Sequence, residues 1–538
     1  MRDRRAPRRG AGRHRLELAR VSTSGPVIVD VGAPSFEDVV AVARDGARVE
    51  LAPGARAAIE GARGVIEALV HDARPHYGVS TGFGALATRH IPVDRRTQLQ
   101  RSLIRSHAAS SGAEVEREVV RALMLLRLST LATGHTGVRL QVAATYAALL
   151  SAGITPVVRE HGSLGCSGDL APLAHCALAL MGEGPVRDAD GTEMDAGDAL
   201  RAAGIAPVEL AEKEGLALIN GTDGMLGMLV LAIWDLRRLL TVADITASMS
   251  VEALLGTDAV FAADLQELRG QPGQIASAAN IRALLDGSAI VASHRGPEDT
   301  RVQDAYSLRC APAVAGAARD TLAHAALVAE RELGAAIDNP VIAGQGDEVR
   351  VASNGNFHGA PVGYALDFLA IAVADVASMA ERRTDRFLDP ARSHGLPPFL
   401  AADPGVDSGL MIAQYTQAAI VSDLKRLAVP ASVDSIPSSA MQEDHVSMGW
   451  SAARKLRRSV DGLTRVLAVE LLTAARGLDL RAPLQPAAAT GAVLAEVRRA
   501  VPGPGPDRYL TPEIEAVAEL VRSGAIVAAA ERVTGRLA

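Results

Sequence analysis

The sequence predicts a mainly α-helical protein built around a bundle of long helices, with a small mixed α/β region near its N-terminus. Hydrophobic residues make up 48% of the 538 residues, yet aromatic residues only 3%. The apolar content is therefore mostly Ala, Leu and Val, which suits helices that pack closely on one another. From Arg96 onward, apolar residues recur at spacings of three and four over long segments. Segments of this length favour a bundle of nearly parallel helices.

The part of the chain before Pro92 mixes short strands and helices. "VIVDVG" (27–32) alternates as a strand does, and "SFEDVVAVARDG" (35–46) reads as an amphipathic helix capped by Ser35. A second helix is predicted over "GARAAIEGARGVIEALVHDA" (54–73). The glycine-rich stretch "HYGVSTGFGALATRHIP" (76–92) is predicted to be a loop.

Long helical patterns account for the remainder of the chain. They cover residues 97–110, 116–134, 138–153, 318–337 and 362–388, and a last helical block runs from Trp450 to the end, broken by "VPGPGPD" (501–507). We therefore expect four parts: a basic disordered extension (1–25), an N-terminal mixed region with a tyrosine-bearing loop (26–135), a central helical bundle (136–449) and C-terminal helices (450–538).

Charge and cysteine content exclude several classes of protein. The net charge is −7 with both signs mixed, which argues against nucleic acid as the main partner. The first twenty residues carry a local charge of +6, but no apolar segment of a signal peptide follows them. No uncharged apolar run is long enough to predict a membrane span. The three cysteines form no CxxC pair, so a reducing, cytoplasmic location is expected.

Three apparent motifs do not fit their usual context. "GFGALA" (82–87) matches a dinucleotide fingerprint but lies in no strand–turn–helix unit, and "GCSGD" (165–169) has the wrong spacing for a nucleophile elbow. The adjacent residues of "QEDH" (442–445) rarely converge on one ion. No metal site is predicted.

The stretch "GSLGCSGDLAPLAH" (162–175) allows an unusual backbone reaction. Because glycine has no Cβ, the nitrogen of Gly168 can approach the carbonyl carbon of Cys166 and close a five-membered ring. Loss of water from this ring and from the side chain of Ser167 leaves an exocyclic methylene, which is an electrophile. Asp169 is expected to cap the helix that follows, with Pro172 in its first turn. The stretch alone also reads as a simple turn before a helix, and by itself favours that reading.

Other blocks of sequence favour the chemical reading. "GSLGCSGDLAPLAH" resembles the signature of the aromatic amino acid ammonia-lyases, which build a 4-methylidene-imidazol-5-one (MIO) group from an internal Ala-Ser-Gly. Further blocks resemble this family in the same order, from about Val27 to the C-terminus: "YGVSTGFGALA" (77–87), "LQRSLIRSHAA" (99–109), "GLALINGTDG" (215–224), "VQDAYSLRCAP" (302–312), "NGNFHG" (354–359) and "SVDSIPSSAMQEDHVSMG" (432–449).

The resemblance implies a fold, a cofactor and an assembly. The fold is the fumarase/aspartase-like helical bundle, and the cofactor is an MIO formed from Cys166, Ser167 and Gly168, with no exogenous cofactor. The assembly is a homotetramer in which each active site takes residues from three chains. The partner is then a small amino acid substrate, with neither nucleic acid nor a membrane involved.

The resemblance is closest to the histidine-specific branch of the family. Ser106-His107 and Gln442-Glu443-Asp444-His445 distinguish it, because phenylalanine and tyrosine lyases resemble one another in having Phe-Leu or His-Leu at the first position and no Glu in the second run. This implies elimination of ammonia from L-histidine to give trans-urocanate, the first step of histidine degradation. Two alternatives stay open: a tyrosine or phenylalanine lyase or 2,3-aminomutase with the same MIO chemistry, and a non-catalytic scaffold with an uncyclised triad.

Residue roles follow from the same resemblance. Tyr77 is the expected base for the β-proton, and it needs nearby positive charge or helix ends to lower its pKa. Arg309 pairs with the substrate carboxylate, and Tyr306, on the same helical face, holds the amine or moves a proton. Gln303 orients the carboxylate.

The remaining predicted residues shape the pocket. Asn220 orients the carboxylate and the MIO carbonyl, and Phe357 forms a wall. His107 and Glu443 pair with the imidazole, one donating to a ring nitrogen and the other accepting. Glu443 also assists proton transfer, and Ser106 lines the pocket.

Three positions depart from the family pattern. Cys166 stands where Ala is usual, and as a contributor of only its carbonyl it is expected to be a bystander. Asp223 stands where Gln often follows Asn-Gly-Thr, and Met441 where Asn often precedes Gln-Glu-Asp. The sequence offers no physical reason for the last two.

Overall fold

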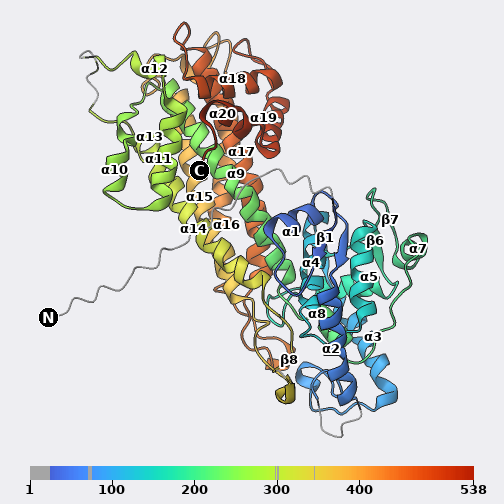
Figure 1. Cartoon of the computed structure of the whole chain (residues 1–538). Helices are drawn as coiled ribbons and strands as arrows, with labels where there is room; N and C mark the ends of the chain where they lie inside the picture. Colours follow the sequence, from blue (N-terminus) through green and yellow to red (C-terminus); the bar gives the residue numbers. More distant parts are fainter. Residues whose placement is uncertain (1–24, 71–75, 297–298, 300–301, 345) are drawn as a thin grey trace, which may run out of the picture.

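The fold has two ends joined by long helices (Figure 1). The computed structural model describes residues 25–70, 76–296, 299, 302–344 and 346–538. The long helices run side by side between the ends, and they are α9 (Asp223–Ala253), α14 (Ala311–Leu333), α15 (Ala360–Leu388), α16 (Met411–Leu427) and α17 (Gly449–Asp479). They pack on one another, with α9 contacting α14, α15 and α17. The predicted bundle of long helices is confirmed.

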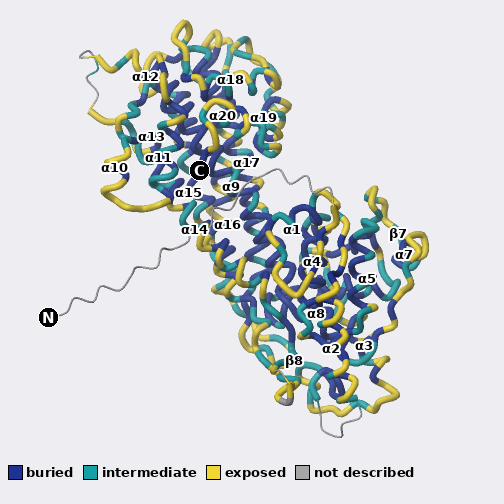
Figure 2. The backbone as a smooth tube through the Cα atoms, viewed as in Figure 1, coloured by how far each residue is buried: buried dark blue, intermediate teal, exposed yellow. Residues whose placement is uncertain are grey.

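The interior of the bundle is apolar and buried along its length, as the dark tube in Figure 2 shows. By length and composition alone, two segments could cross a membrane: Glu214–Ala253 and Ala360–Leu388. The most apolar window of the first is 100% buried inside the protein, and that of the second is 61% buried. The first is therefore a core helix, whereas α15 has an apolar face that the single chain leaves partly uncovered.

The N-terminal region forms the other end of the molecule and combines helices with very short strands. Its helices are α1 (Phe36–Ala43), α2 (Pro53–Leu69), α3 (Arg96–His107), α4 (Arg117–Ala132), α5 (Leu140–Ser151), α6 (Leu170–Leu180), α7 (Ala196–Ala202) and α8 (Glu214–Ile219). Its strands are β1 (Val27–Val29), β2 (Val49–Leu51), β3 (Ser111–Glu114), β4 (Thr155–Pro156), β5 (Arg159–His161), β6 (Pro185–Arg187) and β7 (Glu193–Asp195).

The strands form small sheets rather than one. β1 and β2 pair in parallel, β3 pairs with β5, and β4, β6 and β7 form an antiparallel sheet. The expected strand at 27–32 and the helix capped by Ser35 are confirmed, since Ser35 and Asp38 form a reciprocal capping box. The predicted mixed region is thus present.

The opposite end of the bundle is covered by short helices. These are α10 (Ala263–Glu267), α11 (Pro272–Leu285), α12 (Ala289–Ala292), α13 (Tyr306–Arg309), α18 (Ala488–Ala500), α19 (Thr511–Ser523) and α20 (Ala525–Thr534). A hairpin of β8 (Val341–Ala343) and β9 (Arg350–Ala352) lies at the N-terminal end instead. The predicted break at 501–507 separates α18 from α19. The four-part division stays a prediction, and its basic extension lies almost wholly outside the described residues.

Candidate active site

The loop before α6 holds its backbone in left-handed conformations. The φ angles are +69° at Gly165, +52° at Ser167 and +80° at Gly168. Such a conformation is costly for serine, and residues strained in this way cluster at functional sites. A Cβ on Gly168 would lie 2.2 Å from the backbone nitrogen and oxygen of Gly221, so only glycine fits at that position. The Cys166-Ser167-Gly168 triad therefore meets two requirements of ring closure, a bent backbone and a bare glycine.

Asp169 occupies the N-cap position of α6, as predicted, but its side chain makes no capping hydrogen bond to that helix. Its carboxylate accepts hydrogen bonds from the backbone nitrogens of Gly224 and Met225, both at 2.9 Å, and from Ser163 Oγ at 2.8 Å. Two of these donors lie in the first turn of α9, where backbone N–H groups have no helical partner. Asp169 thus ties the triad loop to the start of the central helix.

A pocket of about 600 Å³ opens over the triad. Five predicted residues line it, together with Ser106: Tyr77, His107, Ser167, Asn220 and Glu443. They come from the glycine-rich loop, the end of α3, the triad loop, the end of α8 and the segment before α17. Segments far apart in the sequence therefore meet around Ser167.

Glu443 lies directly against the triad. Its Oε1 accepts from Ser167 Oγ at 3.2 Å, and its Oε2 accepts from Ser438 Oγ at 3.1 Å. The same Oε2 lies 3.7 Å from Cys166 Sγ. The two serines fix the carboxylate beside the position at which the electrophile would form.

His107 presents a hydrogen-bond acceptor to the pocket. Its Nδ1 lies 2.9 Å from the carbonyl oxygen of Leu103, which can only accept, so Nδ1 carries the hydrogen and the neutral ring has its lone pair on Nε2. Burial lowers the pKa of His107, although the Leu103 carbonyl and the Glu443 carboxylate oppose this. The neutral ring is therefore favoured near pH 7, and of the two roles expected for His107 the structure favours accepting.

Tyr77 is held in place by its own loop. Its hydroxyl oxygen accepts from Gly84 N at 3.2 Å, and its ring meets Phe83 edge-on, with 6.4 Å between ring centroids. Burial raises the pKa of Tyr77, the Gly84 N–H lowers it, and the carboxylates of Glu443 and Asp338 raise it further. Within one chain, the charged groups that act on Tyr77 are carboxylates, whereas a tyrosine that serves as a base needs nearby positive charge.

The rest of the predicted set lies elsewhere in the chain. Tyr306 and Arg309 form α13, with the guanidinium carbon 4.7 Å from the tyrosine ring centroid, which confirms their shared face. Tyr306 is 70% exposed, and Gln303 is also exposed. Figure 1 places α13 at the end of the bundle far from α3, α8 and β8. The predicted site residues thus fall into two separate groups within one chain.

Phe357 is half-buried and does not line the pocket, but its segment contacts the triad loop, because Gly359 N donates to Gly165 O at 3.0 Å. Asn339 was not predicted from the sequence, yet it lines the pocket and its backbone oxygen accepts from Asn220 Nδ2 at 2.9 Å. The run of polar residues before Pro340 was the available signal.

Two of the departures now have physical reasons. Asp223 is buried, and its Oδ2 lies 3.4 Å from Nη1 of the fully buried Arg127. An acidic residue at this position therefore balances the charge of a buried arginine. Met441 has φ +69°, in a run of left-handed residues that begins at Ser439. Asn tolerates this conformation better than other side chains, which accounts for its usual presence there.

Comparison with known proteins identifies the family. The family model described as aromatic amino acid lyase matches residues 35–499. The chain belongs to this family. Among curated relatives, the histidine ammonia-lyase of Streptomyces coelicolor is 66% identical over 512 residues, covering 95% of this chain and 99% of the relative. That of Streptomyces avermitilis is 65% identical over 513 residues, with the same coverage.

Solved structures of the family share the fold. A tyrosine aminomutase from Streptomyces globisporus superposes with a TM-score of 0.89 at 38% identity and covers 95% of this chain and 100% of its own. The histidine ammonia-lyase of Trypanosoma cruzi gives 0.87 at 38% identity and covers 94% of this chain and 95% of its own. The predicted fold class and family are confirmed.

Proposed function

We propose that the protein is a histidine ammonia-lyase that converts L-histidine to trans-urocanate and ammonia. The observation that carries the proposal is the pairing of His107 with Glu443 in one pocket beside Ser167. Curated relatives at 65–66% identity are histidine ammonia-lyases, whereas the solved structures at 38% identity include both a histidine ammonia-lyase and a tyrosine aminomutase. Among aromatic amino acid side chains, a protonated imidazole carries two ring N–H groups, one for a nitrogen acceptor and one for a carboxylate.

The residues fit an MIO group. Gly168 lies in a backbone cradle that a Cβ would fill, and the buried Asn220 Oδ1 has no hydrogen-bond partner in the described part of the chain. The ring formed from Cys166, Ser167 and Gly168 would supply an electrophilic carbon that activates the amino group as a leaving group. The free oxygen of Asn220 is an acceptor, so it would take a hydrogen bond from the amino group of the substrate.

The protein side chains bind the substrate and move its protons. His107 Nε2 accepts from the one N–H of a neutral imidazole, and Glu443 accepts from the second N–H that the imidazolium form of the substrate carries, or takes up a proton. A substrate without these N–H groups would leave both acceptors buried and unpaired, which is how such a pocket rejects phenylalanine. Tyr77 removes the β-proton, and Arg309 binds the carboxylate in a bidentate pair.

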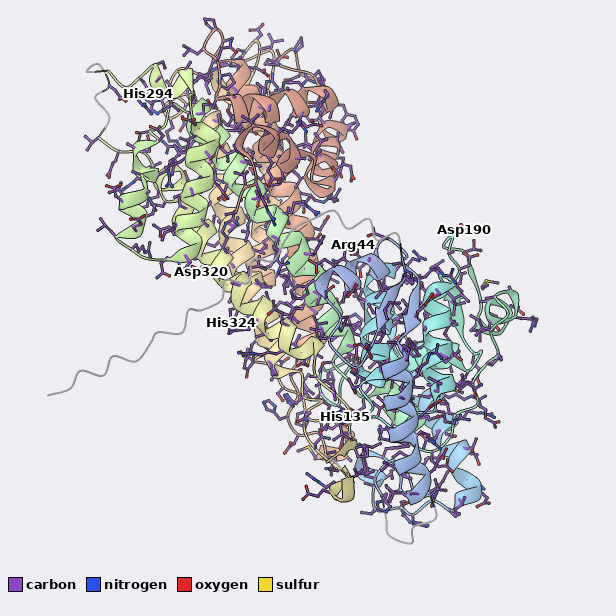
Figure 3. The ribbon with its side chains drawn as sticks, in the orientation of Figure 1. Arg44, His135, Asp190, His294, Asp320 and His324 are labelled. Carbon is purple, nitrogen blue, oxygen red and sulfur yellow. The ribbon has the colours of Figure 1, made fainter. Side chains whose placement is uncertain are left out.

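We further propose a homotetramer with shared sites. Apolar side chains are exposed along one face of the bundle on α14, α15 and α16: Leu327, Tyr364, Phe368, Ile371, Ile412 and Tyr415. A groove of about 560 Å³ lies between α14 and α15 on this face, with Asp320 and His324 of α14 at its rim (Figure 3). Further copies of the chain would cover this face and bring Arg309 and Tyr306 to the pocket of a neighbour, which would supply the positive charge that Tyr77 lacks.

The absorbance of urocanate during incubation with L-histidine tests the activity. Formation of urocanate supports the proposal, and its absence contradicts it. Parallel assays with L-tyrosine and L-phenylalanine, analysed for both cinnamates and β-amino acids, test the aminomutase alternative that the structural likeness keeps open. Intact mass tests the scaffold alternative, because an uncyclised triad retains two waters.

Complementation tests the shared site. Ser167→Ala and Arg309→Ala are each expected to be inactive alone, whereas tetramers reassembled from an equal mixture regain activity. Random assembly would unite an intact Ser167 with an intact Arg309 in about a quarter of the sites, if the two come from different chains. Failure to regain activity, with mixed tetramers shown by native mass spectrometry, would contradict sharing.

All three cysteines are free, which supports the proposed cytoplasmic location.

A further inference from the structure

A lysine and an aspartate form a fully buried ion pair behind the pocket. Lys213 and Asp338 both have side chains that are 0% exposed, and Lys213 Nζ donates to Asp338 Oδ2. Only three of the 55 basic residues are lysine, and Lys213 is the buried one. Removing two charges from water costs several kcal/mol, and such pairs are often replaceable by apolar residues without loss of stability. Stability is therefore a poor explanation for this pair.

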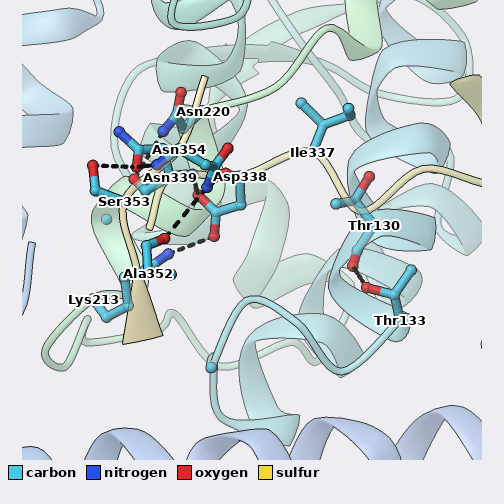
Figure 4. Close-up of polar contacts among 12 residues, drawn as sticks. Thr130, Thr133, Lys213, Asn220, Ile337, Asp338, Asn339, Ala352, Ser353 and Asn354 are labelled. Carbon is cyan, nitrogen blue, oxygen red and sulfur yellow. Dashed lines mark hydrogen bonds and ion pairs between the residues drawn. The ribbon is translucent and has the colours of Figure 1, made fainter. Parts of the chain in front are cut away.

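The turn that contains Asp338 joins the segments around the pocket (Figure 4). Asp338 Oδ1 accepts from Asn339 N at 2.7 Å. Asn339 Oδ1 accepts from Ser353 Oγ and from Asn354 N, both at 3.0 Å, and its backbone oxygen accepts from Asn220 Nδ2 at 2.9 Å. The turn thus connects the start of the segment that carries Phe357 to the end of α8.

The bond from Asn220 fixes the direction of its side chain. Because a carbonyl can only accept, the amide nitrogen faces Asn339 and the oxygen faces the other way. Asn220 lines the pocket, and its Oδ1 is buried without a partner among the described residues. Lys213 and Asn220 bracket the short helix α8, so the ion pair and the Asn220 bond hold both of its ends to the same turn.

Asp338 also acts on the proposed base. Its carboxylate and that of Glu443 both raise the pKa of Tyr77. The other charged or titratable groups that line the Tyr77 pocket are Arg89 and His107. The ammonium group of Lys213 contacts the Asp338 carboxylate and so weakens the effect of that negative charge on the pKa of Tyr77.

We propose that Lys213 and Asp338 are positioning residues of the active site: the pair fixes the turn that aims Asn220, and Lys213 compensates the Asp338 carboxylate next to Asn339 of the Tyr77 pocket. The catalytic part of this inference rests on the proposed function. The electrostatic part does not, because Tyr77 can be titrated without substrate.

Titration of Tyr77 provides the first test. Tyrosinate absorbance, taken as the difference between each protein and its Tyr77→Phe counterpart, isolates this residue from the other five tyrosines. Asp338→Asn should lower the Tyr77 midpoint, because the Asp338 carboxylate raises the pKa of Tyr77. Lys213→Met should shift the midpoint less, because burial lowers the pKa of Lys213 and weakens its compensation of Asp338 at alkaline pH. The Lys213→Met/Asp338→Asn double variant should follow Asp338→Asn, and an unshifted midpoint in Asp338→Asn would overturn the proposal.

Turnover of histidine provides the second test. Lys213→Met and Asp338→Asn should both lower kcat, because the turn that aims Asn220 loses its ion pair. Asp338→Asn should also move the rise of kcat with pH to lower pH, because it removes a carboxylate that raises the pKa of Tyr77. A loss of kcat without this displacement would be a purely structural defect and would overturn the catalytic role. Intact mass, lower than the sequence by two waters, shows that each variant has cyclised. If wild type does not turn over histidine, the proposed function fails while the titration still decides the inference.

A second lysine–aspartate pair provides the matched control. Lys455 Nζ lies 2.6 Å from Asp367 Oδ1, and the Asp367 side chain is 1% exposed. Neither residue lines the Tyr77 pocket. Lys455→Met should lower thermal stability without lowering kcat and without moving the Tyr77 midpoint. An equal shift in this control would show that losing any buried lysine disturbs Tyr77, and would overturn the specific role of Lys213.

Discussion

Replacing Cys166 by Ala tests whether the first residue of the triad contributes anything but its carbonyl. Its side chain is not isolated, because Sγ lies 3.7 Å from Glu443 Oε2. Such an S–H···O contact contributes at most about 1 kcal/mol. Since 1.36 kcal/mol corresponds to a tenfold change in rate, Cys166→Ala should lower kcat by no more than about fivefold.

The thiol is also a poor nucleophile. Burial, together with the Glu443 carboxylate, raises the pKa of Cys166 to about 12. At pH 8 only about one molecule in ten thousand then carries the thiolate, which is the reactive form. Loss of the buried sulfur should cost about 1 kcal/mol of stability, which is small compared with a typical folding free energy.

Initial rates of urocanate formation at saturating histidine and intact mass measure these effects. Ser167→Ala is the inactive reference and should keep both waters. Cys176→Ala, a buried cysteine on α6, is the control for losing a thiol away from Glu443. A fall in kcat of more than thirtyfold for Cys166→Ala alone, or retention of the two waters, would refute the bystander role.

Three further substitutions test the geometry around the triad. Gly168→Ala should abolish the two-water mass loss, because its Cβ would lie 2.2 Å from the Gly221 backbone; a cyclised variant would contradict the close approach. Met441→Asn should raise the free energy of unfolding by about 1 kcal/mol, as urea denaturation measures, because it suits φ +69°. The free energy of unfolding of Asp169→Asn, relative to that of wild type, should increase as the pH rises from about 4 to 7. Burial raises the pKa of Asp169 to about 7, so over this pH range native wild type keeps a proton that the unfolded chain loses, and the stability of wild type falls. The same pH dependence of the free energy of unfolding in both proteins would contradict this.

Local features of the fold could be predicted from sequence because their causes are local. The periodicity of the long helices and the Ser35–Asp38 capping box depend on residues within a few positions of one another. Asp169 has the same capping chemistry, but its donors are Gly224 and Met225, which follow it by more than fifty residues. Sequence pattern identified the residue type and could not identify its partner.

The same limit applies to the site. Family motifs predicted Tyr77, His107 and Glu443, and the structure brings them into one pocket. The effect of Asp338 on Tyr77 could not be predicted, because it depends on where the turn after α14 lies. A departure such as Met441 became intelligible only when its φ angle was known.

The length of α9 explains why one chain contains two incomplete groups. The helix begins at Asp223, beside the Gly221 backbone that cradles Gly168. It ends at Ala253, shortly before Thr257, whose backbone nitrogen donates to Asp304 Oδ2 at 2.7 Å, next to α13. A helix of 31 residues is about 46 Å long, so Ser167 and Arg309 lie roughly one helix length apart. No loop movement closes such a distance, whereas an antiparallel neighbour along the exposed face of α14, α15 and α16 would place the far end of its own α9 beside this pocket. In such an assembly, the long bundle that separates the two groups within a chain would also set their spacing between chains.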